Sequence, residues 1–326
     1  MTRFIGEQNS VAFLFESGTY GSTSGAGNWI GLVQENSIDE NIGVTQIRYL
    51  GNMSRNVGQM VNGTLDYTGE LTYYPQNFKL LYYALGSTYE TSGTTMTHNI
   101  SEANGNVANG FVATPNNPWI SFTLEDSKTT VTGSNFIRTL KGCNVDEFKI
   151  SAAEGELVEC SANYIAQELV YSSGARTAAT VNTETPYLWS DCTINMPSGT
   201  KIDKISDFEF GIKNNFEANH YLNGSRVIHT PTPGNREYNF DITMHLDDAQ
   251  AKKFYDEYYI GGSTFNTILD MTKSAARNCI ITMSGCKVID MEVPSTFEGP
   301  IETSIKIVPT SCSAISKDNV YKYTPW

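Results

Sequence analysis

The sequence has few charged residues and no basic cluster. Only 17% of its 326 residues are Asp, Glu, Lys or Arg, and the formal net charge is −13. An acidic chain without a Lys/Arg patch is repelled by phosphate groups, which excludes a protein that reads DNA grooves. Because 40% of the residues are hydrophobic, the low charge content indicates a folded chain and not a disordered one.

Long apolar runs are also absent. No stretch is long enough to form a membrane-spanning helix, and the N-terminal residues lack the charged-then-apolar pattern of a signal peptide. We therefore expect no membrane association, and synthesis and assembly in a host cytoplasm. In a reducing compartment the six cysteines are expected to be small buried hydrophobes and not three disulfides.

The motifs that usually carry chemistry are missing as well. No cysteines form a CxxC pair, and the four histidines (His98, His220, His229 and His245) do not have the spacing of zinc ligands. No GxSxG nucleophile motif or calcium-loop pattern of carboxylates occurs. We predict no catalytic residue, no cofactor and no metal site, and hence no enzyme. A glycosidase with two carboxylates from distant positions would escape such a search.

Aromatic residues and glycine, by contrast, are plentiful. The chain contains 18 Tyr, 15 Phe and 27 Gly, with Thr and Asn throughout. Aromatic and β-branched side chains pack well on a pleated surface, and glycine suits the turns between short strands. This composition predicts a mainly β fold.

An order of strand, short helix and hairpin occurs twice. The Gly142-Cys143 pair of the first hairpin recurs as Gly285-Cys286 in the second, and a Glu-Gly turn follows each pair. Each predicted helix ends at glycine, as a left-handed C-cap requires. The corresponding segments are a strand at 64–73, a helix at 75–86 and a hairpin at 142–166, then a strand at 236–246, a helix at 247–260 and a hairpin at 285–308.

This repetition predicts two tandem domains. The first covers residues 1–171, the second covers 187–326, and a small, polar linker at 172–186 joins them. The first copy has a longer connection between helix and hairpin. Residues 88–118, rich in Thr, Ser, Gly and Asn, are therefore expected to be an insertion that forms a surface loop.

Two long polar hairpins precede the strand–helix blocks, at 37–62 and 205–235. Such hairpins are not needed to stabilise a small domain, and in assemblies they commonly contact other subunits. Their predicted tips are Gly51, Asn52, Met53, Ser54 and Arg55 in the first hairpin, and Leu222, Asn223 and Gly224 in the second.

The layout resembles the tail tube proteins, or major tail proteins, of tailed bacteriophages and archaeal viruses. The motifs that carry the resemblance follow one another along most of the chain: Glu16-Ser17-Gly18-Thr19-Tyr20-Gly21, Trp29-Ile30-Gly31-Leu32, Val61-Asn62-Gly63, Leu85-Gly86 and Gly142-Cys143. The resemblance implies two β-sandwich or barrel domains in tandem, each with one short flanking helix and a long hairpin.

The resemblance also implies a function. Such domains pack into rings, rings stack into a tube, and the tube conducts the genome during ejection. With two domains in one chain, a trimer with pseudo-sixfold symmetry is favoured over a hexamer. The implied partners are further copies of the chain and the other tail proteins (tape measure, terminator, and baseplate or tip), and viral DNA passes without specific binding. The implied location is the virion tail.

An acidic lumen would keep DNA off the wall of such a tube. Strand alternation places Asp66 and Glu70 on one strand face, and Glu237 and Asp241 on one face of the equivalent strand. The predicted lumen-facing acids are Asp39, Glu40, Asp66, Glu70, Glu209, Glu217, Glu237 and Asp241. An ordinary solvated face explains the same pattern equally well.

Two other classes remain open at this stage. A β-sandwich adhesin or carbohydrate-binding fibre module would suit the abundance of Tyr and Asn, but it would be expected to carry a signal peptide or a host-facing tip. A β-sandwich hydrolase is disfavoured because no catalytic constellation is recognisable.

Overall fold

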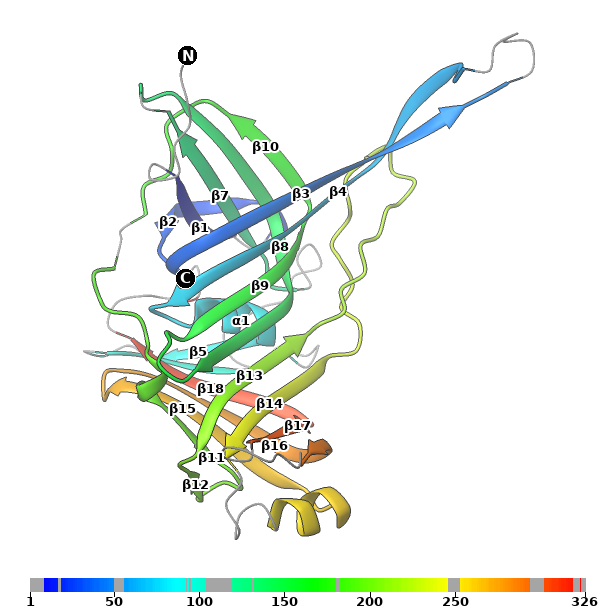
Figure 1. Cartoon of the computed structure of the whole chain (residues 1–326). Helices are drawn as coiled ribbons and strands as arrows, with labels where there is room; N and C mark the ends of the chain where they lie inside the picture. Colours follow the sequence, from blue (N-terminus) through cyan, green and yellow to red (C-terminus); the bar gives the residue numbers. More distant parts are fainter. Residues whose placement is uncertain are drawn as a thin grey trace.

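The computed structural model describes residues 9–16, 19–49, 56–91, 93, 95–103, 119–130, 132–179, 182–245, 253–293, 302–318 and 323. The fold is mainly β, as predicted, and its strands pair antiparallel throughout the named ladders (Figure 1). Three groups of strands can be distinguished, and two long strands are shared between groups.

The largest group, here called the central sheet, runs through both halves of the chain. Its eight strands, in spatial order, are β3 (Gly31–Ile47), β4 (Gln59–Pro75), β9 (Glu159–Ala166), β8 (Asn135–Ala153), β13 (Ile205–Lys213), β14 (Glu237–His245), β17 (Glu302–Val308) and β16 (Arg277–Glu292). The pairing of β8 with β13 joins strands of the first half to strands of the second half.

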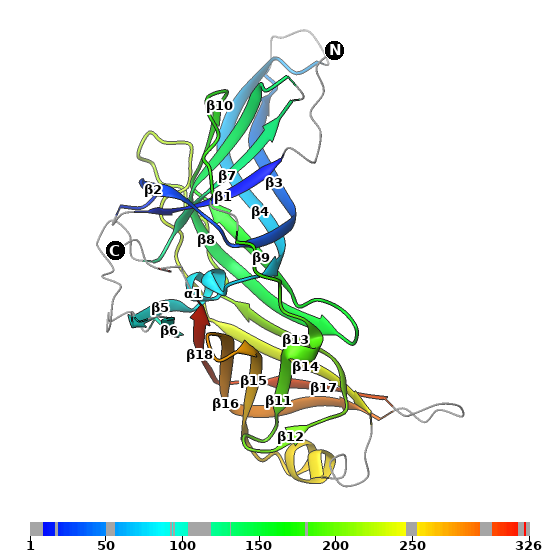
Figure 2. The same ribbon diagram turned by 90° about the vertical axis from the view of Figure 1, so that its left-hand side faces the viewer.

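Two smaller sheets lie on the central one. The N-terminal sheet has the order β2 (Thr23–Asn28), β1 (Ser10–Glu16), β7 (Phe122–Thr129), β8 and β10 (Glu168–Ser172). The C-terminal sheet has the order β12 (Lys201–Ile202), β11 (Cys192–Asn195), β15 (Phe265–Ser274), β16, β18 (Ser311–Asp318), β6 (Met96–Glu102) and β5 (Gly86–Thr91). Figure 2 shows the N-terminal sheet in the upper part and the C-terminal sheet in the lower part of an elongated molecule.

The core forms one cluster that continues from one half into the other. In the first half, Phe13 of β1 stacks on Phe122 of β7, and Phe122 meets Tyr164 of β9 edge to face. In the second half, Ile281 and Phe240 are fully buried. Alternating buried residues on strands of both layers are the pattern of a β-sandwich core.

The helices are short. Helix α1 (Lys79–Leu85) ends at Gly86, whose φ of 95° allows the left-handed C-cap. All seven of its residues are buried, so α1 lies inside the core and does not merely flank a sheet. In the second half a π-helical segment, η3 (Phe254–Ile260), buries Phe254 and Tyr258, and a single 3₁₀ turn, η2 (Trp189–Asp191), precedes β11.

The predicted blocks correspond closely to the observed elements. The two predicted strands lie in β4 and β14, and the two predicted hairpins are β8–β9 and β16–β17. Of the predicted helix at 247–260, residues 247–252 fall outside the described residues. The prediction of a surface loop at 88–118 is wrong for its first part, because Gly86–Thr91 and Met96–Glu102 are strands. Strand β6 pairs with β18, which lies more than 200 residues later.

Candidate assembly surfaces

One face of the central sheet is polar from strand to strand. Residues that are direct cross-strand neighbours share a face. One such row runs across six strands, through Ser37, Glu70, Asn163, Glu147, Lys213 and Glu237. The alternate residues, such as Leu71, Ala162 and Phe148, are buried in the core. The face that carries this row is called the open face below.

Carboxylates dominate the open face. Among the described residues, thirteen acids belong to it, against four lysines, which makes the face strongly negative. The acids are Glu35, Asp39, Asp66, Glu70, Glu147, Glu159, Asp207, Glu209, Glu237, Asp241, Asp290, Glu292 and Glu302, and the lysines are Lys149, Lys213, Lys287 and Lys306.

The titration of two groups reflects this negative field. Partial burial acts to lower the pKa of Lys149, but Glu209 and Glu147 outweigh it and raise the pKa; these carboxylates lie 3.6 and 3.3 Å from its ammonium group. Burial raises the pKa of Asp241, and the charge of Glu209 on the neighbouring strand adds to the rise. The acids of this face are therefore close enough to influence one another.

The structure brings six of the eight predicted acids onto the open face: Asp39, Asp66, Glu70, Glu209, Glu237 and Asp241. Glu40 lies on the opposite face, where its carboxylate accepts a hydrogen bond from Tyr171 and lies 3.7 Å from Arg138. Glu217 lies outside the central sheet, in the segment between β13 and β14.

Several acids of the open face were not recognised in the sequence. Glu147, Asp290 and Glu292 lie on β8 and β16, the first strands of the two predicted hairpins, and are not among the predicted lumen-facing acids. Glu147 lies between the buried Val145 and Phe148, next to a bulge. This alternation is the sequence signal that places the Glu147 side chain on the outward face.

Within the described residues, no further strand extends the central sheet at either outer edge. Among the described residues, β3 has β4 as its one ladder partner. The part of β16 beyond Cys286 has β17 as its one ladder partner within the described ranges, whereas Cys286 itself pairs with Phe265 of β15. An open edge presents unpaired backbone N–H and C=O groups that another chain can bind. The central sheet can therefore be extended at both ends.

The two halves of the central sheet repeat one another residue by residue. The β8–β9 pairs become the β16–β17 pairs when 143 is added to both numbers; for example, Phe148 opposite Ala162 corresponds to Met291 opposite Ile305. Both hairpins carry the same bulge, between Val145 and Glu147 and between Val288 and Asp290.

The preceding strands repeat in the same way. Strand β3 corresponds to β13 with 172 added, and both have a bulge at the matching place, between Val33 and Glu35 and between Ile205 and Asp207. The spatial order β3-β4-β9-β8 is thus repeated as β13-β14-β17-β16. Two equivalent four-stranded units lie side by side in one continuous sheet.

A comparison with protein-family models identifies the family of this chain. The model described as phage tail tube protein matches residues 6–308. The chain belongs to the phage tail tube protein family. It is therefore a structural component of a virus tail, and its β-rich fold agrees with that assignment. A search of the curated proteins found no match.

The hairpin β3–β4 of this tail tube protein projects far from the core (Figure 1). Its distal part is exposed and apolar, with Ile42, Val44, Met60 and Val61 all exposed to solvent. Exposed apolar side chains at this density indicate a contact surface. The predicted tip residues Gly51, Asn52, Met53, Ser54 and Arg55 lie outside the described residues.

The second predicted hairpin tip is a turn, but its arm differs from the prediction. Gly224 has a φ of 79°, and the N–H of Asn223 donates to the carbonyl of Tyr221, so the chain reverses at Leu222-Asn223-Gly224. The arm does not extend freely, because it runs along the first hairpin. His220 lies 2.7 Å from Asp66, and the N–H of Leu65 donates to the carbonyl of Arg226.

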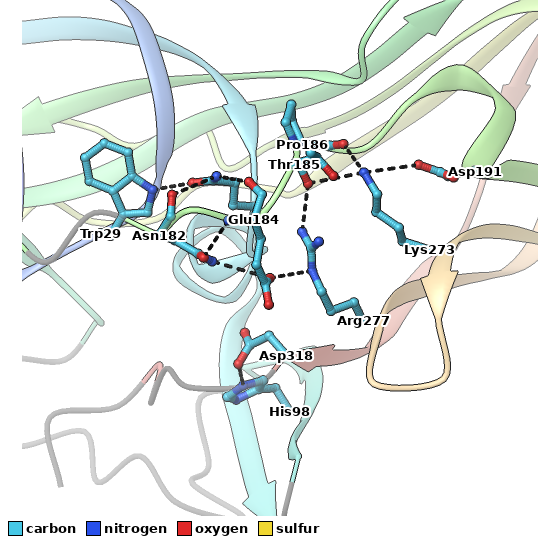
Figure 3. Close-up of polar contacts among 11 residues, drawn as sticks. Trp29, His98, Asn182, Glu184, Thr185, Pro186, Asp191, Lys273, Arg277 and Asp318 are labelled. Atoms are coloured by element: carbon cyan, nitrogen blue, oxygen red, sulfur yellow. Dashed lines mark hydrogen bonds and ion pairs between the residues drawn. The ribbon is translucent and has the colours of Figure 1, made fainter.

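The predicted linker is held by both halves (Figure 3). From the first half, the amide of Gln76 donates to the carbonyls of Asn182 and Glu184. From the second half, the guanidinium of Arg277 lies 2.6 Å from the Glu184 carboxylate and donates to the carbonyl of Thr185. These contacts, here called the linker clasp, fix the connection between the two units; the domain boundaries themselves remain a prediction.

Other kinds of site find little support. Within the described ranges, no three His, Cys, Asp or Glu side chains are grouped as metal ligands would be. In the same part of the chain, no helix is long and apolar enough to cross a bilayer. The six cysteines are free thiols, and Cys192 alone among them is partly exposed.

Proposed function

We propose that the chain assembles into closed rings that stack into the tail tube, and that the tube is the conduit for genome ejection. The observation that carries this proposal is the central sheet: two equivalent four-stranded units lie side by side, carry an acidic open face, and end in edges that no further described strand extends. Repetition of one joint around an axis closes a ring.

The width of the conduit favours three chains per ring. Strands spaced about 4.8 Å apart and tilted by about 40° give a barrel of roughly 48 Å diameter for about 24 strands, which is three chains. After side chains are allowed for, the lumen still admits a DNA duplex of about 20 Å. Six chains would give a barrel of roughly 95 Å, far wider than DNA requires. A trimer with pseudo-sixfold symmetry is therefore preferred over a hexamer.

The open face is the proposed lumen wall. Its carboxylates, including the predicted Asp39, Asp66, Glu70, Glu209, Glu237 and Asp241, repel the phosphates of passing DNA. Because Asp66 and Glu70 correspond to Glu237 and Asp241 in the second unit, the repulsion is spread evenly around the ring. Glu40 and Glu217 are not part of this wall.

The projecting hairpins are the proposed contacts between rings. The β3–β4 arm exposes Ile42, Val44 and Met60, which need a partner surface once rings stack. The turn at Leu222, Asn223 and Gly224 lies on the arm that accompanies it. At the ends of the tube, the same surfaces contact other tail proteins, such as the tape measure, terminator and baseplate or tip components. Assembly takes place in the host cytoplasm, and the protein has no enzymatic role.

Negative-stain electron microscopy of the purified chain at high concentration tests this function. Hollow tubes or stacked rings are expected. A chain that stays monomeric at all concentrations contradicts the proposal and turns attention to a β-sandwich adhesin or fibre module, for which glycan binding is the next measurement.

A further inference from the structure

A single strand pair in the middle of the central sheet joins the two four-stranded units of one chain. Within the chain, β8 pairs with β13, so that Phe148 lies opposite Ile212, Lys149 opposite Gly211 and Ile150 opposite Phe210. This pairing is called the internal joint. Phe148, Ile150, Phe210 and Ile212 are buried, while Lys149 lies on the open face.

The repeat carries each side of the internal joint to an open edge. Strand β8 corresponds to β16 with 143 added, and β13 corresponds to β3 with 172 subtracted. The corresponding strands are those that end the central sheet. Among the described residues, β3 and the part of β16 beyond Cys286 are unpaired on their outer sides. The two edges of the sheet are thus equivalent to the two strands already joined at its middle.

We propose that β16 of one chain pairs antiparallel with β3 of a second copy, in the register of the internal joint. This inference rests on the proposed ring. Carrying the register over places Asp290 opposite Asn41, Met291 opposite Glu40, Glu292 opposite Asp39 and Val293 opposite Ile38. The occupant of each edge is therefore another copy of the same chain.

The apolar pattern fits this register. Val293 and Ile38 correspond to Ile150 and Phe210, which form a buried apolar pair in the internal joint. In the single chain, Val293 is 44% exposed and would be covered by the neighbouring copy. A slip by one residue would bring Ser37 or Asp39 of the open face opposite Val293, because successive side chains point to opposite faces of a sheet.

The charges make the joint between chains weaker than the internal joint. Glu292 lies opposite Asp39 in the proposed register, whereas Lys149 lies opposite Gly211 in the internal one. Like charges directly opposite one another are destabilising across a strand pair. Glu40 is charged, whereas the equivalent residue of the internal joint, Ile212, is apolar. The Glu40 carboxylate is already paired with Arg138 and Tyr171 of the same chain. Ring closure is therefore expected to strengthen when salt screens the open face.

Disulfide trapping tests the register. In the double variant Asp39→Cys/Glu292→Cys, the two Cα atoms would lie about 5 Å apart across chains, within the range of a disulfide. The matched control, Ser37→Cys/Glu292→Cys, places the partner two residues along the same face, roughly 7–8 Å away. Mild oxidation of assembled rings is expected to give cross-linked dimers and trimers with the first pair, at least fivefold more than with the control or with the wild type.

The possible outcomes distinguish a wrong register from a wrong proposed function. Rings that form but cross-link equally with the control pair, or not at all, overturn the register and leave the proposed function standing. A chain that forms no ring overturns both. As a second measurement, Asp39→Asn is expected to tighten ring association about two- to fivefold at low salt and hardly at high salt; an unchanged association at low salt also contradicts the register.

Discussion

Gly142 and Gly285 occupy the same position in the two halves of the molecule. Each has a positive φ, 66° and 59°, and each lies where a long strand leaves an outer sheet and enters the central one. The buried carboxylate of Glu16 accepts a hydrogen bond from the N–H of Gly142, and the side chain of Asn266 accepts one from Gly285. Each glycine therefore marks the bend at which a long strand passes from an outer sheet into the central sheet.

Substitution at such a bend should be costly. In Gly142→Ala the new Cβ would lie 2.8 Å from the Tyr20 ring and 2.9 Å from the Gln167 side chain, in addition to the strain of a positive φ. We expect a loss of about 2–4 kcal/mol in the free energy of unfolding, measured in urea. Gly155→Ala is the matched control, because Gly155 has a φ of 84° but no atom near its Cβ position. It should lose only about 1 kcal/mol; equal losses would mean that contact at the bend contributes nothing.

The linker clasp should contribute measurably to stability. Arg277 is buried, pairs with Glu184 and donates to the carbonyl of Thr185. Arg277→Ala is expected to lower the free energy of unfolding by about 1.5–3 kcal/mol, because a partly buried carboxylate and a carbonyl lose their charged donor. Lys201→Ala, which removes the exposed pair with Asp203, should cost less than about 0.5 kcal/mol. A similar small effect for both variants would contradict the role of the clasp.

Stability should depend on pH through Lys79. Burial lowers the pKa of Lys79 to about 7, although Asp318 and Glu90 act to raise it. Between that pH and the ordinary lysine pKa, the unfolded chain binds more protons than the folded one, so stability rises with pH by up to about 1.4 kcal/mol per unit.

Lys79→Met removes this contribution. His98, which lies between Glu90 and Asp318, stays in both proteins and cancels in the comparison. The stability of the wild type relative to Lys79→Met is expected to increase from pH 7 to pH 10 in thermal or urea unfolding. A difference that is constant over this range would show that Lys79 stays charged in the folded chain.

The charge of the open face should decide whether assembled tubes hold DNA. Glu70→Lys/Asp241→Lys places new cations at equivalent positions of the two units. Tubes of this variant are expected to retain DNA at low salt and to release it as salt rises, since phosphate contacts depend steeply on salt. The control is Glu168→Lys, which makes the same acid-to-lysine replacement on β10 of the N-terminal sheet. DNA retention by the control alone, or by neither variant, would argue against the open face as the lumen wall.

Much of this architecture follows from local sequence patterns. The repeated Gly-Cys pairs located both hairpins, and alternation placed Asp66 with Glu70 and Glu237 with Asp241 on common faces, because the period of a strand is two. The same rule also separates Asp39 from Glu40, which are adjacent and cannot share a face. The prediction of both as lumen-facing acids rests on their charge and not on strand alternation.

The remaining features depend on contacts far apart in the chain. Residues 88–102 resemble a polar loop, but β5 and β6 extend a sheet whose next strand is β18. The sequence predicts a helix at 75–86, but the burial of Lys79 among Phe13 and Phe15 depends on β1. Neither could be deduced from local periodicity, since tertiary packing overrides it.

The mass of the smallest closed ring tests the central claim most directly. If one chain supplies two equivalent units of the wall, native mass spectrometry or mass photometry should find a ring of three chains, each of 36.0 kDa. A closed ring of six chains would contradict the pseudo-sixfold arrangement, because each chain would then occupy only one position in the wall.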